Sequence, residues 1–312
     1  MRHLKFLPVL LAVITFTVVG LGTVRAEGGT SACSRITLAA PHSEACNAEI
    51  AAFPAPDLER PVAFDSKLDG VSAPRSVLLP KNGTPYPIGW LLKAWYYSDA
   101  PGVEPPAYTT DRIVEKAALV YLYATVNVNG RDWHMVAPDR WIEGEHIAAL
   151  YFPEKPENVS GQWIALDLTE QTLIAYEDSQ PIFATLISAA WEGYGVTQEG
   201  LFNIYARAKH TTFRGPPWKL DNPDYVYKFV PHVQFFDGNI ALHGAYWHDW
   251  FGFPRSHGCV NIPVGDARWL WEWVAQSADK WGGDTGYWLP KPEAAPFVYV
   301  YASPRTGDTR LR

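Results

Sequence analysis

The stretch from Ala241 to Pro263, ALHGAYWHDWFGFPRSHGCVNIP, gathers three of the nine histidines and one of the three cysteines of the chain among aromatic residues and glycines. The side chains in it that offer chemistry are His243, His248, His257 and Cys259. Three interpretations compete: a metal site, a cysteine nucleophile with a histidine base, and a core strand and turn that merely contain histidine. The choice among them decides which fold and which chemistry the sequence predicts.

A metal site would need ligands that converge on one point. His243 and His248 are five residues apart, whereas one helix face needs a spacing of three or four and one strand face an even spacing. Gly258 interrupts the strand that could align His257 with Cys259. The spacing therefore disfavours a metal, and we expect neither a metal nor another cofactor.

A cysteine nucleophile explains more of these residues. Because Cys259 follows a glycine, the backbone can turn sharply there, expose the sulfur and aim adjacent N–H groups at an incoming carbonyl oxygen. His243 ends an expected strand, NIALHG, and the loop after it can fold back to bring the imidazole to the thiol. An imidazolium there would lower the thiol pKa and favour a thiolate–imidazolium pair. An inert, buried cysteine remains the alternative at this point.

The composition predicts a β-rich protein long enough for two modest domains. The 312 residues include 14 tryptophans and 16 tyrosines but only two methionines, and such rings fill cores or line surfaces that hold saccharide or peptide. The net charge is −7, and lysines and arginines do not cluster. A nucleic-acid partner is therefore excluded, because phosphate binding needs a basic surface.

The N-terminus predicts export. Residues 1–26 combine a cationic start, a continuous apolar run and a small-residue exit, the pattern of a signal peptide cleaved near Ala26 or kept as a membrane anchor. We expect an extracytoplasmic location, in the periplasm or cell wall, either free or tethered. Cys33 and Cys46 would then lie in an oxidising compartment and close a small loop if they pair, which leaves Cys259 as the odd cysteine.

Changes in texture divide the rest of the chain into three segments. Residues 27–75 are rich in Ala, Pro, Ser and Glu with little periodicity, which predicts a leader or linker. Residues 76–152 contain short strands, with NVNG as a turn between two of them. After the boundary PEKPENVSG, residues 160–303 begin a fresh alternating pattern with WIALDL.

The third segment is expected to be mostly β with one prominent helix. Strands are predicted at QWIALDLTEQTLIAYED, IFATLISAA, GLFNIYARA, VPHVQFF, NIALHGAY and FVYVYA. A helix is predicted after Pro263, running to about Lys280, because apolar residues recur there at helical spacing. These apolar residues are Ala267, Leu270, Trp271 and Val274.

Residues 76–152 resemble bacterial SH3-like modules, which often accompany cell-wall enzymes. The resemblance rests on a strand before a polar turn, then DWHMV, then RWIEGEHIA. It implies a small SH3-like β-barrel in front of the third segment. The alternative is that these strands belong to one continuous domain, since all-β domains can exceed 200 residues.

The opening stretch resembles the signature of the L,D-transpeptidase family, a His-Gly pair, a loop, and then Ser/Thr-His-Gly-Cys followed by an apolar residue and Asn or Arg. Here His243 and Gly244 form the pair, and Ser256 to Asn261 read SHGCVN. Twelve residues separate His243 from Ser256, which is typical of the family. WIALDLTEQTLIAYEDSQPIFATLISA, TQEGLFNI and VPHVQFFDGNIALHG precede the signature in family order, so the resemblance covers about 161–302.

The resemblance implies a role for each signature residue. Cys259 is the nucleophile, His243 is the base that activates it and later protonates the leaving amine, and the backbone carbonyl of Gly244 orients that base. The N–H groups of Gly258 and Cys259 are the expected oxyanion donors. His257 is expected to have a structural or positioning role.

Further residues are expected around the substrate groove. Ser256 should stabilise the turn at the groove, and Asn261 can line it. The segment HTTFRGPPWKLDNPDYVYKF is expected to be an inserted lid, with ordinary packing of a surface loop as the alternative. Candidate lid residues that close on substrate, or meet its carboxylate, are Trp218, Tyr225, Tyr227, Arg214 and Lys219. His248 and Asp249 are expected to be solvated loop residues, and an auxiliary role in the groove is the alternative.

The activity implied by the resemblance is peptidoglycan L,D-transpeptidation. Cys259 would form a thioester with a tetrapeptide stem, release D-Ala, and pass the acyl group to an amine of a neighbouring stem. Carbapenems, which acylate the same thiol, are the expected inhibitors. Water as the acceptor would give a carboxypeptidase or endopeptidase, a protein lysine would give a protein-to-wall ligase, and a vestigial site would leave a cell-wall-binding protein.

Overall fold

The computed structural model describes residues 31–191, 193–215, 224–277, 287–288 and 296–304. Within this part the chain is mostly β, with one long helix, α3 (Val264–Ser277), soon after Cys259. Both features confirm the fold class expected from the sequence. The expected helix end at Lys280 lies outside the described residues.

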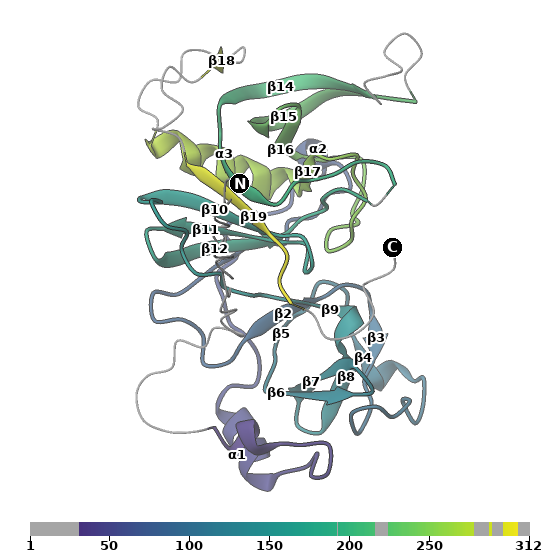
Figure 1. Cartoon of the computed structure of the whole chain (residues 1–312). Coiled ribbons are helices and arrows are strands. Elements are labelled where there is room, and N and C mark those ends of the chain that lie inside the picture. The colour runs from purple at the N-terminus through teal and green to yellow at the C-terminus, as the bar shows by residue number, and fades with distance from the viewer. Residues whose placement is uncertain (1–30, 192, 216–223, 278–286, 289–295, 305–312) are drawn as a thin grey trace, which may run out of the picture.

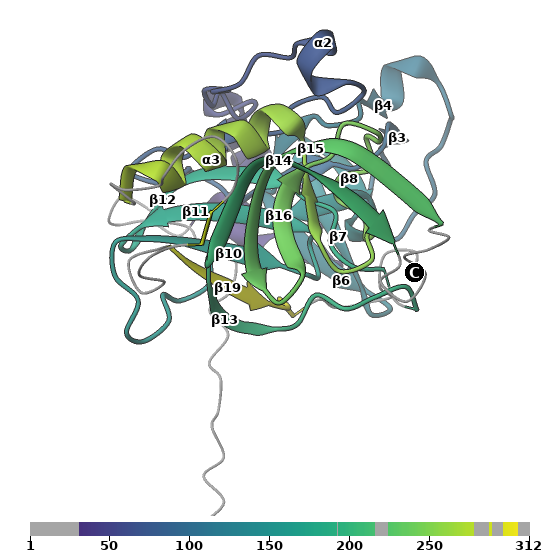
Figure 2. The same ribbon diagram turned by 90° about the horizontal axis from the view of Figure 1, so that it is seen from above.

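Two large sheets and α3 form the C-terminal half of the chain (Figure 1). The first sheet has the order β1 (Val77–Leu78), β12 (Gln180–Leu186), β11 (Thr172–Glu177), β10 (Gln162–Asp167), β19 (Phe297–Tyr301), β13 (Gly200–Asn203). The second has the order β17 (Val260–Ile262), β16 (Ile240–Gly244), β15 (Tyr225–Asp237), β14 (Ala206–Gly215), β18 (Tyr287–Trp288). Figure 2 shows α3 running alongside β14 to β16.

The six-stranded sheet is buried on both faces. Because side chains alternate along a strand, Ile164 and Leu166 of β10 pack with α3 and the second sheet, while Trp163 and Ala165 pack against the smaller N-terminal sheets. This explains why β10 and β11 are almost continuously apolar in sequence. The two halves of the molecule therefore share a core across this sheet.

Three small sheets make up most of 76–152. They are β5 (Leu119–Tyr121) with β2 (Ile88–Leu91) and β9 (Ile147–Ala149); β3 (Trp95–Tyr96) with β4 (Ile113–Val114); and β6 (Ala124–Val128) with β7 (Arg131–Ala137) and β8 (Arg140–Glu143). Short 3-10 turns occur at η1 (Ala32–Arg35), η2 (Thr110–Arg112) and η3 (Gly144–His146). The NVNG turn joins β6 to β7 as predicted. The SH3-like resemblance stays a prediction, and β1 pairs with the large sheet instead of with these strands.

The segment expected to be a linker packs closely against the rest of the protein. Cys33 and Cys46 form a disulfide, and helix α1 (Glu44–Ala52) buries Ile50 in the core that contains Trp90. A second short helix, α2 (Ser66–Asp69), lies next to α3. The expectation of a mere spacer is therefore wrong for 31–75, because scattered apolar residues without periodicity can still be buried by tertiary contacts.

No described helix is long and apolar enough to cross a membrane. The apolar run within 1–26, predicted to be a signal or anchor, lies outside the described residues.

Asp266, in the first turn of α3, fixes the helix to the linker segment and to the first sheet. Its buried carboxylate accepts hydrogen bonds from the Arg75 N–H at 2.8 Å, the Ser76 hydroxyl at 2.6 Å and the Thr185 hydroxyl at 2.6 Å. Asp266→Ala would leave three buried donors without their acceptor, so we expect about 3 kcal/mol of destabilisation. Urea unfolding measures it, with Glu272→Ala on the exposed side of α3 as the control. Equal unfolding midpoints for the two variants would contradict this assignment.

Candidate active site

The site forms where β16 and β17 pair in parallel. Leu242 lies opposite Val260 and His243 opposite Asn261. Continuing this register by one residue places Cys259 opposite Ala241. Since paired residues of parallel strands point to the same face, the side chains of His243 and Cys259 belong to one face of the sheet. The two residues taken from the sequence as base and nucleophile are thus brought to the same place.

A long connection follows from this pairing. Parallel strands need a crossover of about a dozen residues or more, and residues 245–259 supply it without a helix. We call residues 245–259 the crossover loop. It includes the aromatic-rich run AYWHDWFGF and the turn SHGC, which ends at Cys259.

His243 is buried, and its ring is held by one hydrogen bond. Its Nδ1 lies 3.1 Å from the backbone oxygen of Gly244, the partner that the sequence resemblance implied for the base. Burial lowers the pKa of His243 to about 4, although the Gly244 contact acts in the opposite direction. The neutral ring donates from Nδ1, because a carbonyl only accepts, which leaves the lone pair on Nε2. Nε2 is therefore the basic nitrogen.

Cys259 is a partly exposed free thiol. It packs against the buried cluster of Val230, Val233 and Ala241, and its Sγ donates to the Asn239 carbonyl at 3.6 Å. Burial raises the pKa of the thiol to about 11, while a backbone hydrogen bond from Ala241 lowers it in part. Desolvation of each group on its own favours a neutral thiol and a neutral imidazole. The thiolate–imidazolium pair expected from the sequence stays a prediction, because proton transfer between the two groups also depends on their mutual attraction.

The turn before Cys259 is closed by a serine and a glycine. The Ser256 hydroxyl donates to the Cys259 carbonyl and accepts the N–H of Gly258 at 3.1 Å. Gly258 has a φ of 138°, and a Cβ there would lie 2.5 Å from Ile240 Cδ1. The turn thus needs glycine at this position. Ser256 stabilises the turn as predicted, but its buried, engaged hydroxyl does not line a groove.

The same contacts correct the predicted oxyanion donors. Since the Gly258 N–H already donates to Ser256, it is not free to receive a developing oxyanion in this structure. The sequence could not show this, because glycine and serine two residues apart are compatible with many turns. The Cys259 N–H is the other donor named from the sequence.

A second segment, around Ala189 and Thr197, is hydrogen-bonded to this turn. The Thr197 hydroxyl donates to the Gly258 carbonyl at 2.8 Å, and the Ala189 carbonyl accepts the N–H groups of Arg255 and Ser256, each at 3.0 Å. Gln171 in turn accepts the Ala189 N–H at 2.6 Å. No local pattern could have indicated this role for Gln171, because its partner is 18 residues away along the chain.

Aromatic rings surround the two reactive residues. His257 is exposed, and its ring lies 5.5 Å from Tyr194 and 4.9 Å from Tyr225. Trp247 stacks on Tyr227 at 3.9 Å and lies 5.9 Å from the His243 ring. Tyr225 is close enough to Cys259 for the two to interact electrostatically. Aromatic rings of this kind can contact a peptide or a saccharide.

The expected lid is not a separate insertion in the described part. Strands β14 and β15 continue as a hairpin as far as the Gly215–Tyr225 pair, so Arg214, Tyr225 and Tyr227 lie on strands. The lid prediction missed this because an irregular, proline-containing sequence hid the strand ends. Trp218 and Lys219 lie outside the described residues.

Two further predictions change with the structure. Asn261 is buried instead of exposed in a groove, and its amide lies 2.8 Å from His248 Nε2. His248 and Asp249, expected to be solvated, are only partly exposed, and Asp249 is bound by Arg75 and Lys116. Sequence reasoning could not find these partners because Arg75 is 174 residues away.

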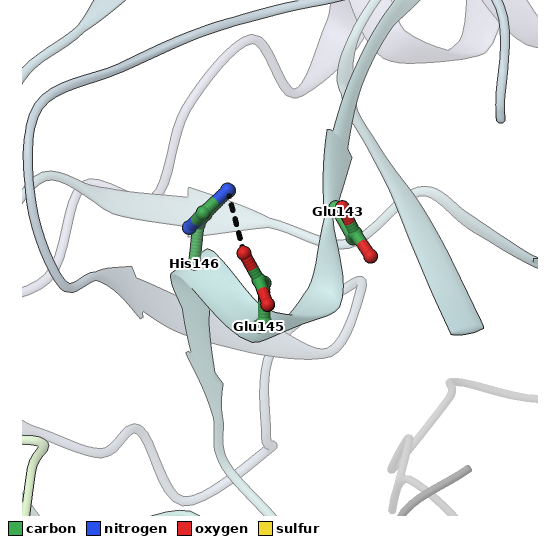
Figure 3. Close-up of side chains that lie close together, drawn as sticks. All are labelled: Glu143, Glu145 and His146. Carbon is green, nitrogen blue, oxygen red and sulfur yellow. Dashed lines mark ion pairs between the residues drawn. The ribbon is translucent and has the colours of Figure 1, made fainter. Parts of the chain in front are cut away.

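One group of side chains in the described part has donor atoms close enough for a metal, and it lies outside this site. Glu143, Glu145 and His146 come from β8 and η3 (Figure 3). His146 Nε2 lies 3.3 Å from Glu145, and Glu143 pairs with Arg131 at 2.9 Å. These ion pairs explain why the three side chains lie together without a cation. The absence of a cofactor stays a prediction.

Comparison with known proteins identifies the segment that carries the site. Residues 161–291 match the model of the YkuD family, the L,D-transpeptidase catalytic domain. No curated protein matches the chain.

Solved structures of L,D-transpeptidases are also similar to it. The protein from Stackebrandtia nassauensis is 24% identical, with a TM-score of 0.34, over 48% of this chain and 60% of that one. The protein from Xylanimonas cellulosilytica is 25% identical, with a TM-score of 0.32, over 48% of this chain and 65% of that one. The E. faecium catalytic domain acylated by ertapenem is 21% identical, with a TM-score of 0.35, over 46% of this chain and 99% of that one. The chain thus spans less than two thirds of the first two.

The pKa of Cys259 makes a prediction about its reactivity. Because only the thiolate attacks iodoacetamide and the pKa of the thiol is raised to about 11, alkylation should speed up by about tenfold per pH unit between pH 7 and pH 10. Intact mass measures the rate, and Cys259→Ser, which retains the Cys33–Cys46 disulfide, is the control. A rate that is already constant above pH 7 would show a preformed thiolate and contradict the neutral pair.

Proposed function

We propose that the protein is a peptidoglycan L,D-transpeptidase with Cys259 as its nucleophile and His243 as its base. One observation carries the proposal. A free thiol lies on the same sheet face as a buried histidine whose Nδ1 is fixed by Gly244, inside the segment that matches the L,D-transpeptidase catalytic domain.

Acylation begins from the neutral pair. As Sγ of Cys259 attacks the carbonyl carbon of the third stem residue, Nε2 of His243 takes the thiol proton, so charge develops only during the step. The Cys259 N–H is the oxyanion donor in this proposal. The C–N bond to the terminal D-Ala then breaks, its amine takes the proton from His243, and a thioester remains.

Deacylation reverses these roles. An amine of a neighbouring stem attacks the thioester carbon and gives a proton to Nε2 of His243. The C–S bond breaks, an amide cross-link forms, and the sulfur recovers its proton. No metal or oxidant is needed for this balance. Water or a protein lysine could accept the acyl group by the same steps, and the products distinguish these acceptors.

Export would place the site where its substrate lies. The signal-like segment 1–26 predicts translocation, and the Cys33–Cys46 disulfide suits an oxidising compartment. We therefore propose action in the periplasm or cell wall.

The test follows products from disaccharide-tetrapeptides by mass spectrometry. The purified protein should give dimers with loss of D-Ala and an intact-mass adduct with a carbapenem, and Cys259→Ala should give neither. Circular dichroism and melting temperature check that the variant folds. Tripeptides alone would mean that water is the acceptor, and no product or adduct dependent on Cys259 would leave a wall-binding protein.

Arg255 is the cation that we propose for a stem carboxylate. It is exposed four residues before Cys259, and its guanidinium lies 4.7 Å from the Trp250 ring and 5.9 Å from the Trp191 ring. Flanking indoles restrict the guanidinium and lower the entropy lost when it pairs with an anion.

Arg255→Gln should raise KM by about tenfold for stems with free carboxylates and leave kcat unchanged, since a charged hydrogen bond contributes about 1.5 kcal/mol. Steady-state kinetics with free and amidated stems measure this effect. Arg140→Gln, an exposed arginine over the Tyr97 ring in the N-terminal half, is the control. An equal KM change for amidated stems would contradict a carboxylate partner.

A further inference from the structure

The crossover loop is fastened by residues from outside the matched segment. We propose that Asp249 is a positioning residue, and that Arg75 and Lys116 hold it so that the loop keeps Trp247 and His248 in place beside the reactive pair. The inference rests on the proposed function for its effect on turnover, although the loop contacts themselves do not.

Asp249 receives two cations from distant parts of the chain. Arg75 Nη2 lies 2.8 and 2.7 Å from its two carboxylate oxygens. Lys116 Nζ lies 2.8 Å from one of these oxygens and 3.1 Å from the Asp249 backbone oxygen. Arg75 comes from the segment expected to be a linker, and Lys116 comes from the small sheets. One carboxylate in the crossover loop therefore joins three parts of the protein.

Arg75 is itself immobilised. Its N–H donates to Asp266, and its carbonyl accepts the indole N–H of Trp90 at 3.0 Å. The arginine is also buried. Asp249 therefore pairs with a cation whose backbone N–H and backbone carbonyl are both hydrogen-bonded. A rigid partner loses little further entropy on pairing, which makes it a suitable anchor for a loop.

The crossover loop has a second contact with the linker segment, at Val71, four residues before Arg75. The N–H of Val71 donates to the Tyr246 carbonyl at 3.2 Å. Gly70 has a φ of 62°, and a Cβ there would lie 2.5 Å from the Tyr246 oxygen. Only glycine allows this approach of the two backbones. Residues 70–75 thus hold the crossover loop at Tyr246 and at Asp249.

Trp247 and His248, the loop residues next to Asp249, lie near the residues proposed to react. Trp247 packs against the same buried cluster as Cys259, and its ring lies 5.9 Å from the His243 ring. His248 contacts Asn261, the residue paired with His243. Releasing Asp249 would let Trp247 and His248 move together. Displacements of about 1 Å near reacting groups can lower rates by as much as 100-fold.

A purely stabilising ion pair makes a different prediction. The Asp249 side chain is 28% exposed and the Lys116 side chain 44% exposed, and pairs this accessible contribute only about 0–1 kcal/mol to folding. The Arg75 side chain is only 10% exposed, but Asp249→Asn keeps a side-chain oxygen that can accept its N–H. A structural role alone would thus give a small loss of stability and no change in the chemistry at Cys259. A positioning role gives a large change in that chemistry with the same small loss of stability.

The experiment compares Asp249→Asn and Asp249→Glu with the wild type in the full-length protein. For Asp249→Asn we expect kcat for cross-linking to fall by about tenfold with KM little changed. Alkylation of Cys259 by iodoacetamide should rise by about threefold, because a looser loop covers the sulfur less. Asp249→Glu should recover most of kcat. Asp99→Asn, which breaks the exposed pair with Arg112, is the control and should change neither rate.

Each outcome bears on the proposal. Unchanged kcat and alkylation in Asp249→Asn would overturn it, and so would a fall in kcat matched by a large fall in melting temperature. If the wild type forms no cross-links, the proposed function fails, but the alkylation rates still decide whether Asp249 positions the loop.

Discussion

The site depends on the parallel pairing of β16 with β17. This pairing brings His243 and Cys259 to one face of a sheet, and it forces the chain to cross from the end of one strand to the start of the next. The crossover loop has no helix to stiffen it, so its shape depends on contacts from elsewhere. Segment 188–197 holds the end of the loop near Cys259, and residues 70–75 with Lys116 hold its middle.

Burial then sets the chemistry of the pair. Desolvation lowers the pKa of His243 to about 4 and raises that of Cys259 to about 11, so the burial of each group favours its neutral form. The hydrogen bond to Gly244 selects the tautomer in which Nε2 is basic. A backbone carbonyl does here what a carboxylate does in many triads, without introducing a charge that would stabilise an imidazolium.

The sequence predicted the features that depend on local pattern. The alternation of WIALDL and the apolar spacing of the helix after Pro263 located strands and the helix, and the His-Gly and Ser-His-Gly-Cys motifs named the residues that we propose to react. It could not predict what depends on distant contacts. Examples are the capture of the Gly258 N–H by Ser256 and the pairing of Asp249 with Arg75. The linker segment was misjudged for the same reason, since its role lies in tertiary contacts.

The most direct test of this account is the ¹⁵N NMR spectrum of the His243 ring at pH 7, assigned by its loss in His243→Gln. We expect a neutral ring with a protonated Nδ1 and an Nε2 that carries a lone pair. Two protonated ring nitrogens would show an imidazolium paired with a thiolate. That result would contradict the neutral pair from which the proposed chemistry starts.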